Sequence, residues 1–201
     1  MTINSPRCSR SKLPALERHR SLWEGCQGCI LHESASQKVF YRGDIPCDVL
    51  FVGTAPGPTD DALGVPIRGE TADTFNEVVD RSIALSPRKL SYAITNAVLC
   101  KPPIIENTIE TPRPPEKEEL SACSPRLSQF LALGTPKLIV NLGKIADKAT
   151  LAAFTIDDVY YRTITIYDTT YMMKSDDRRR EIEKAILQLS QAYQNVFGKK
   201  A

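Results

Sequence analysis

The chain has 201 residues, a formal net charge of +2, 42% hydrophobic residues and 25% charged residues. These values are typical of a soluble globular protein, and they give no overall charge that would favour nucleic acid. No apolar run approaches the ~20 residues that a membrane-spanning helix needs, so we expect no membrane partner. The first residues lack the apolar segment of a secretory signal, so we expect a cytoplasmic protein with reduced thiols.

Residues 1–20 form a basic segment in which a single acid, Glu17, accompanies five cations. The cations are Arg7, Arg10, Lys12, Arg18 and Arg20. One interpretation is an arm that contacts phosphates, and the other is a solvated, flexible terminus. Residues 21–201 contain no internal repeat and no change in composition that would mark a second domain, so we expect one domain there.

The hydrophobic pattern predicts strands that alternate with helices. Short apolar runs predict buried strands at 48–52, 92–96, 137–141 and 161–166. Helical spacing of apolar residues predicts helices over about 71–84, 115–133, 143–151 and 176–197. This alternation indicates an α/β fold, a three-layer α/β/α sandwich around a mostly parallel, four-stranded sheet. Ligands bind such sheets at the carboxyl ends of the strands, which directs attention to loops 53–69, 96–103, 142–144 and 167–174.

Four cysteines have the spacing of a metal centre. Cys26 and Cys29 form a CxxC pair, and Cys100 and Cys123 stand alone further along the chain. A structural zinc site commonly uses two close pairs, whereas four scattered thiolates also suit a [4Fe–4S] cluster, and spacing alone leaves both open. We interpret Cys8 and Cys47 as small buried apolar residues.

Several motifs in order resemble the iron–sulfur type (family 4) of the uracil-DNA glycosylases. The CxxC pair is followed by Leu31 and His32, and residues 53–69 (GTAPGPTDDALGVPIRG) resemble the family's G-E-A-P-G-x-x-E-D-x-x-G-x-P-F-x-G. Residues 95–103 match T-N-x-V-x-C-x-P-P, residues 119–123 match E-x-x-x-C, and residues 136–146 resemble P-x-I-I-V-x-L-G-x-x-A. The match runs from about Cys26 to Tyr193.

The resemblance implies a structural [4Fe–4S] cofactor on Cys26, Cys29, Cys100 and Cys123. It also implies DNA as partner, with one base flipped into a pocket. Asn96 would read the base edge, since an amide offers one donor and one acceptor. The loop residues Gly53, Thr54, Ala55, Pro56 and Gly57 would approach the base or phosphate closely. Asp60 and Asp61 would position water or stabilise the sugar cation, although either could instead cap the loop.

Three positions depart from the family pattern. Thr54 stands where the family has Glu, and Ile67 replaces a Phe that stacks on uracil. Asp168 takes the place of a His that reaches the leaving base oxygen, and an ionised carboxylate there would repel the developing charge. Lys174 or Arg162 could supply positive charge from another direction.

We therefore expect a monomeric DNA glycosylase that removes uracil or another modified pyrimidine from single- or double-stranded DNA. The alternative is a catalytically inactive relative that keeps the fold as a DNA- or protein-binding module. A redox-sensing iron–sulfur regulator is a third class.

Overall fold

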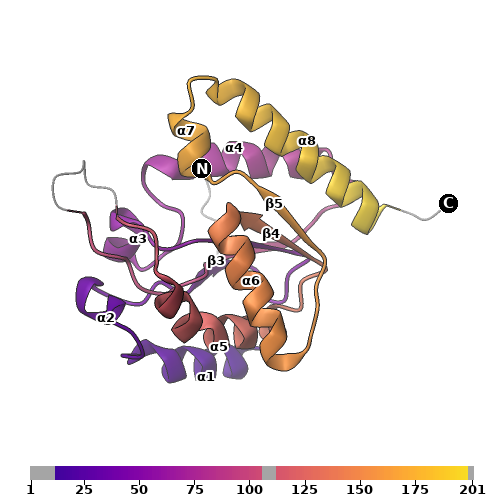
Figure 1. Ribbon diagram of the computed structural model, residues 1–201. Coiled ribbons are helices and arrows are strands. Elements are labelled where there is room, and N and C mark those ends of the chain that lie inside the picture. Colours follow the sequence, from indigo (N-terminus) through magenta and orange to yellow (C-terminus); the bar gives the residue numbers. More distant parts are fainter. Residues whose placement is uncertain (1–11, 106–111, 199–201) are drawn as a thin grey trace.

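The computed structural model describes residues 12–105 and 112–198, which form three layers (Figure 1). Its five strands are β1 (Tyr41–Gly43), β2 (Val49–Gly53), β3 (Tyr92–Asn96), β4 (Leu138–Leu142) and β5 (Thr163–Ile166). Its helices are α1 (Leu13–Glu24), α2 (Leu31–Ser34), α3 (Pro58–Leu63), α4 (Glu70–Ala84), α5 (Lys117–Gly134), α6 (Lys144–Asp157), α7 (Thr169–Lys174) and α8 (Arg178–Phe197). None of the described helices is long and apolar enough to cross a membrane.

The sheet has the strand order β1-β3-β2-β4-β5. The four strands expected from the sequence are parallel to one another, which confirms the α/β class and the mostly parallel sheet. Strand β1 adds a fifth, antiparallel member beside β3. Its three residues Tyr-Arg-Gly are partly exposed and carry no apolar run, so hydrophobic pattern alone does not reveal it.

Each face of the sheet has its own core, and strand β2 contributes to both. Val49 and Phe51 join the apolar cluster under α4, α7 and α8, whereas Leu50 and Val52 join the cluster under α1, α5 and α6. This follows from the two-residue period of a strand, which sends successive side chains to opposite faces. Burial on both faces explains why the parallel strands read as continuous apolar runs.

Three short or shifted helices differ from the sequence expectation. Helix α3 lies inside the expected 53–69 loop and α7 inside the expected 167–174 loop, and α6 continues to Asp157 rather than ending near 151. Residues 13–20 of the expected basic arm belong to α1, which packs on α5 through buried Leu16 and His19. Lys12 directly precedes α1, and residues 1–11 of that arm lie outside the described residues.

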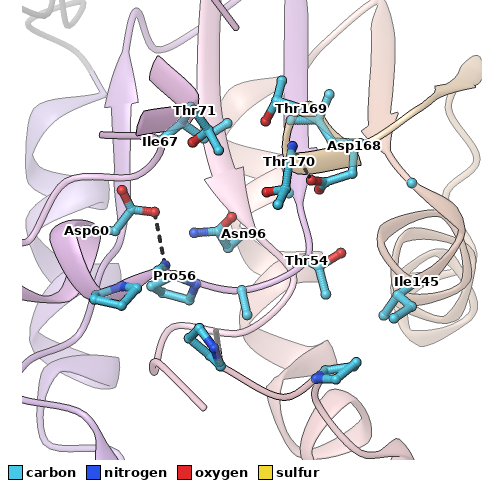
Figure 2. Close-up of a pocket in the computed structure, with 18 of the residues that line it drawn as sticks. Thr54, Pro56, Asp60, Ile67, Thr71, Asn96, Ile145, Asp168, Thr169 and Thr170 are labelled. Atoms are coloured by element: carbon cyan, nitrogen blue, oxygen red, sulfur yellow. Dashed lines mark hydrogen bonds between the residues drawn. The ribbon is translucent and has the colours of Figure 1, made fainter. Parts of the chain in front are cut away.

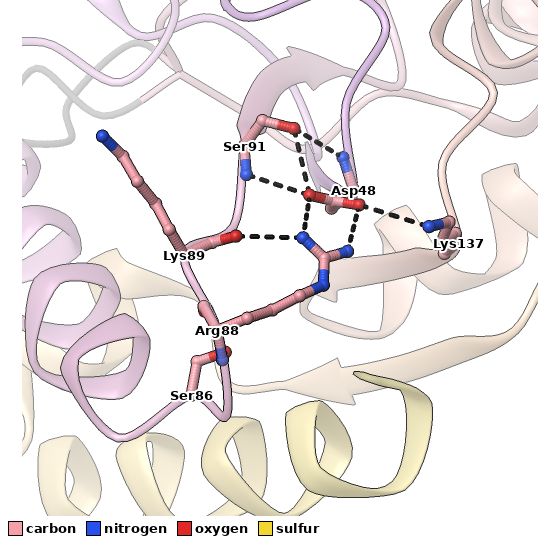
Figure 3. Close-up of polar contacts among 6 residues, drawn as sticks. All are labelled: Asp48, Ser86, Arg88, Lys89, Ser91 and Lys137. Carbon is pink, nitrogen blue, oxygen red and sulfur yellow. Dashed lines mark hydrogen bonds and ion pairs between the residues drawn. The ribbon is translucent and has the colours of Figure 1, made fainter. Parts of the chain in front are cut away.

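A polar network fixes the amino ends of the central strands (Figure 3). The Asp48 carboxylate, just before β2, accepts bonds from Nη1 and Nη2 of Arg88 at 2.9 and 2.5 Å. It also accepts from the Ser91 amide at 3.2 Å and lies 3.7 Å from the Lys137 ammonium. The network therefore joins the segments that lead into β2, β3 and β4 at the edge of the sheet opposite their carboxyl ends.

Candidate functional site: a cleft at the carboxyl edge of the sheet

A cleft of about 890 Å³ lies where β2, β3 and β4 end. Its walls are the β2–α3 loop, the end of β3, the turn before α6, the start of α7 and residues 112–115. It brings together ten of the site residues expected from the sequence: Gly53, Thr54, Ala55, Pro56, Gly57, Asp60, Ile67, Asn96, Asp168 and Lys174. This position agrees with the rule that places ligands at the carboxyl ends of parallel strands.

Asn96 is the last residue of β3 and is drawn in the middle of the cleft in Figure 2. Its side chain is buried, and its Nδ2 atom has no hydrogen-bond partner among the described residues. A side chain added at Gly53, its neighbour across the β2–β3 pair, would collide with the Asn96 Oδ1 atom. A glycine at 53 is therefore what allows the Asn96 amide to lie against β2 with its nitrogen available to a ligand.

Asp60 lies in the first turn of α3 and lines the cleft. Its carboxylate accepts bonds from the Arg68 amide at 2.6 Å and the Gly57 amide at 3.2 Å. Burial raises the pKa of Asp60, although the amides of Arg68, Gly57 and Ile67 act in the opposite direction. An ionised carboxylate has about four lone-pair sites, so this one retains acceptor capacity toward a water in the cleft.

Asp61 does not line the cleft. Both of its carboxylate oxygens lie 3.0 Å from the Ser36 amide, and Oδ1 also accepts from the Gln37 amide at 3.4 Å. The side chain is 2% exposed. The structure therefore gives Asp61 the loop-capping geometry that was the alternative to a catalytic position.

Asp168 caps α7 at the rim of the cleft. Its Oδ1 atom accepts a bond from the Thr170 amide at 2.8 Å (Figure 2). Burial raises the pKa of Asp168, against the opposing effect of the bonds from Thr170. Of the two cations considered as replacements for a histidine, Lys174 lines the cleft, whereas the Arg162 carbonyl pairs with Ile139 near the start of β4. Arg162 thus lies at the opposite end of the sheet.

Ile67 adopts a left-handed backbone conformation, with φ of 53°. This region is unfavourable for a β-branched residue, so surrounding contacts must hold it. Arg42 on β1 supplies two of them: it donates from Nε to the Pro66 carbonyl at 2.9 Å and from Nη2 to the Ile67 carbonyl at 3.5 Å. The missed strand β1 therefore positions one wall of the cleft.

Other residues around the cleft were not assigned a role from the sequence. Thr71 lines it outside the expected ligand loops, and Lys144 and Thr170 line it within the expected loops 142–144 and 167–174. Tyr167 and Tyr171 flank the cleft-lining residues 168–170; their rings lie 4.6 Å apart, and each is 52% exposed. An exposed aromatic pair beside a cleft provides a face on which a base can stack.

The four expected ligand cysteines come from three separated segments: the α1–α2 connection, the chain after β3, and α5. Cys100 and Cys123 are buried in one apolar cluster with Leu31, Phe40, Val98 and Leu99, and Cys29 packs against it. Burial raises the pKa of Cys29, and the thiols of Cys123 and Cys26 raise it further. Burial also raises the pKa of Cys100 to about 11, and Cys123 and Cys29 contribute in the same direction. Cys29, Cys100 and Cys123 thus lie in one apolar region, and Cys26 precedes Cys29 by three residues.

The described residues do not form a ready-made site for a single metal ion. In residues 12–105 and 112–198, no three His, Cys, Asp or Glu side chains are close enough to hold one metal ion. Thiolates around one zinc lie about 2.3 Å from it and hence nearly in contact, whereas a four-iron cluster separates its thiolates further. An all-thiol donor set inside an apolar shell fits such a cluster. Cys47 is a buried apolar residue as expected, with its pKa raised by burial to about 12, and Cys8 lies outside the described residues.

Arg126 connects the cysteine region with the cleft. It lies on α5, three residues after Cys123, and is 1% exposed. It donates to the Thr95 hydroxyl at 3.1 Å and to the carbonyls of Asn96 and Ala97 at 2.5 and 2.9 Å. Burial lowers the pKa of Arg126, whereas thiolates at Cys123, Cys100 and Cys26 raise it.

Comparison with known proteins places these features in a family. The model of the uracil DNA glycosylase superfamily matches residues 40–190. A type-4 uracil-DNA glycosylase from Pyrobaculum aerophilum is 34% identical over 134 residues, which are 67% of this chain and 63% of that protein. A type-4 enzyme from Archaeoglobus fulgidus is 31% identical over 140 residues, covering 70% of this chain and 64% of that protein. The chain thus matches less than two thirds of the length of these relatives.

One solved structure has a weaker likeness. It is a solution NMR structure from Methanosarcina acetivorans, titled as a candidate uracil DNA glycosylase, with 15% identity and a TM-score of 0.48. The alignment covers 74% of this chain and 97% of that one. The sequence match, which spans the β1–α8 region and all the cleft walls, carries the assignment: this chain belongs to the uracil DNA glycosylase superfamily and is similar to its type-4 members.

Proposed function

We propose that this protein hydrolyses the N-glycosidic bond of uracil, or of a related modified pyrimidine, in DNA. The observation that carries the proposal is Asn96, a buried residue that lines the cleft and whose Nδ2 atom lacks a partner among the described residues. A buried donor without a partner costs about 1–3 kcal/mol, which a carbonyl of a bound base would offset. The O4 and N3–H groups of uracil match the donor and acceptor of an amide.

The chain's own residues can account for the bond change. In the proposed reaction, Asp60 holds a water, accepts its proton, and the water oxygen bonds to C1′ of the sugar. The C1′–N1 bond breaks, and the bonding electrons leave with the base. The raised pKa of Asp60 suits a general base, since a carboxyl with a higher pKa accepts a proton more readily.

The charge of Asp168 disfavours this reaction. Negative charge develops on the leaving base, and a carboxylate at the rim of the cleft opposes it. The amide of Thr170 favours the ionised form of Asp168, although burial raises its pKa overall. We therefore expect slow excision by the natural chain and faster excision when this charge is removed.

We propose that Cys26, Cys29, Cys100 and Cys123 hold a [4Fe–4S] cluster with a structural role. When bound, the cluster supplies a covalent tie between the α1–α2 connection, the segment after β3 and α5. We propose further that DNA lies across the cleft rim with one base flipped inward. Lys144 and Lys174 line the cleft and would meet phosphates there, and we expect the protein to act as a monomer.

The test is excision by anaerobically purified protein on single- and double-stranded oligonucleotides that carry one uracil. The natural chain would be compared with Asn96→Ala, Asp168→Asn and Asp168→His. Asp168→Asn keeps an N-cap oxygen for α7 and removes the charge, so it separates charge from folding. Asn195→Ala on the exposed face of α8 is the matched control for Asn96→Ala.

We expect cleavage by the natural chain, faster cleavage by both Asp168 variants, and a loss of about 10²-fold in kcat/KM for Asn96→Ala. The Asn195→Ala control should cleave like the natural chain. If the natural chain and both Asp168 variants were folded, loaded with cluster and silent on uracil and on the same oligonucleotides with other modified pyrimidines, the excision proposal would be lost. The second candidate function, a non-catalytic DNA-binding module, would then be favoured, and the N-capped Asp168 carboxylate is the observation behind it.

A further inference from the structure

Arg126 has a position that the folding of an apolar core does not require. Its guanidinium is fully enclosed between α5 and the end of β3, and its Nε atom has no partner among the described residues. Enclosing a charge costs several kcal/mol, and an apolar residue of similar volume is often neutral or better at such a place. A buried charge that remains therefore suggests a role beyond packing.

Among the described residues, the side-chain hydrogen bonds of Arg126 all reach one short segment, residues 95–97. The Thr95 hydroxyl that accepts from Nη1 itself donates to the Phe40 carbonyl at 2.7 Å, so this bond is part of a chain. The Asn96 and Ala97 carbonyls share Nη2. These acceptors fix the backbone on both sides of the Asn96 side chain. Four residues after Asn96, the same segment reaches Cys100.

The candidate counter-charges for Arg126 are the neighbouring cysteines, of which Cys123 lies about one turn before it on α5. No ion pair formed by residues 12–105 and 112–198 involves this guanidinium. The groups that favour its charged form are Cys123, Cys100 and Cys26, which act on its pKa against burial. Cysteines that bind a metal do so as thiolates, so a loaded centre would supply the missing counter-charge.

The cysteine region and the cleft also share a wall. Ala55 lines the cleft and packs against the apolar cluster that contains Cys100 and Cys123. The Asn96 side chain in turn lies against Gly53, two residues before Ala55. A shift of the segment after β3 would therefore move the amide relative to both the loop and the cleft.

We propose that Arg126 is a positioning residue that holds the base-reading Asn96 in register by joining its backbone to the cysteine centre, whose thiolates balance the buried charge. The inference rests on the proposed function for the role of Asn96 and on the four-cysteine cluster for the charge. The balance between the Arg126 charge and the cysteine centre can be tested without measuring excision.

Two variants separate charge from hydrogen bonding. Arg126→Met removes both, whereas Arg126→Lys keeps the charge and loses the planar fork that reaches three acceptors. Arg81→Met is the control. Arg81 lies on α4, on the other face of the sheet from α5, and its half-exposed side chain pairs with Glu77 of α4 and Glu183 of α8. Each protein, with its cluster reconstituted, would be assayed by a redox titration followed by electron paramagnetic resonance. Binding would be compared for an oligonucleotide with one non-cleavable 2′-fluoro-2′-deoxyuridine and the same oligonucleotide with 2′-fluoro-2′-deoxycytidine.

We expect Arg126→Met to lower the reduction potential of the cluster, because a nearby positive charge favours the added electron. It should also reduce the preference for uracil over cytosine by about tenfold, the effect of one lost charged hydrogen bond. Arg126→Lys should keep the potential and lose preference, and Arg81→Met should change neither property. If the natural chain shows no preference for uracil over cytosine, the proposed function fails. The reduction potential of the cluster in Arg126→Met still tests whether the charge of Arg126 is balanced by the cysteine centre.

An unchanged potential in cluster-loaded Arg126→Met would refute the balancing of charge, and unchanged preference in both variants would refute the positioning role. If Arg126→Met fails to take up the cluster but Arg126→Lys succeeds, the requirement for a counter-charge is supported. If neither takes it up and Arg81→Met does, Arg126 is a folding residue only and the proposal is overturned.

Discussion

Asp60 and Asp61 are adjacent acids that the fold assigns to different surroundings. The first turn of α3 points Asp60 into the cleft, while Asp61 turns back to the amides of Ser36 and Gln37. Sequence reasoning placed both in one role because a helical turn of six residues was not foreseen in a Gly- and Pro-rich loop. On a helix, neighbouring side chains diverge by about 100°, which is what separates the two carboxylates.

The two acids should therefore respond differently to the same change. Asp60→Asn should lower kcat by about 10²-fold with little effect on KM, because it removes the proposed base. Asp61→Asn should leave kcat near that of the natural chain and destabilise the fold by about 1–2 kcal/mol, because it weakens charged hydrogen bonds to two amides. Steady-state excision and urea unfolding would measure both effects. The reverse pattern would exchange the two roles.

At the scale of elements, the major strands and helices follow from hydrophobic period, and the short elements do not. Strand β1 has three residues, and α3 and α7 have six each, so none offers enough period to be recognised. Local signals were present: Pro58 occupies the first turn of α3, and Asp168 caps α7. These short elements nevertheless form two walls of the cleft and hold the Ile67 backbone.

Helix α7 yields a prediction about DNA binding. The exposed Tyr167–Tyr171 ring pair lies beside cleft residues 168–170, so Tyr171→Ala should weaken binding of a single-stranded oligonucleotide by about tenfold, near the low end of the effect of one lost base stack. Tyr160→Ala, at an exposed position after α6, is the matched control and should bind normally. Fluorescence anisotropy at fixed salt measures both, and equal affinities would exclude a stacking role for Tyr171.

At the scale of the whole molecule, long-range ties join segments that are distant in sequence. The cysteine region joins three such segments, and Cys100→Ala should therefore remove the proposed cluster and lower the melting temperature of the entire domain. Visible absorbance and thermal unfolding would report the two losses. Cys47→Ala is the control, because Cys47 is buried away from this cluster, and it should keep full absorbance. A Cys100→Ala protein with a complete cluster and an unchanged melting temperature would contradict the ligand assignment.

The network at the opposite edge predicts how stability depends on pH. Burial alone would raise the pKa of Asp48, but Arg88, Ser91 and Lys137 outweigh it and lower that pKa. A carboxyl with a lowered folded-state pKa stabilises the fold above its unfolded-state pKa, and the contribution disappears as pH falls through the folded value. Asp48→Asn should therefore cost about 1–2 kcal/mol at pH 7 and progressively less below pH ~4. Urea unfolding of the natural chain and Asp48→Asn across this pH range measures the difference in their free energies of unfolding. A difference that does not change with pH would rule out the charge of Asp48 as the cause.

The sequence by itself determined the α/β class, the four parallel strands, the family and ten of the residues that line the cleft, because these depend on local apolar period and on contiguous motifs. Only the tertiary structure decided which acid faces the cleft, that β1 completes the sheet and holds Ile67, and that Arg126 lies between the cysteines and Asn96. These relations join segments distant in sequence, and no period or motif within one segment encodes the contact between two.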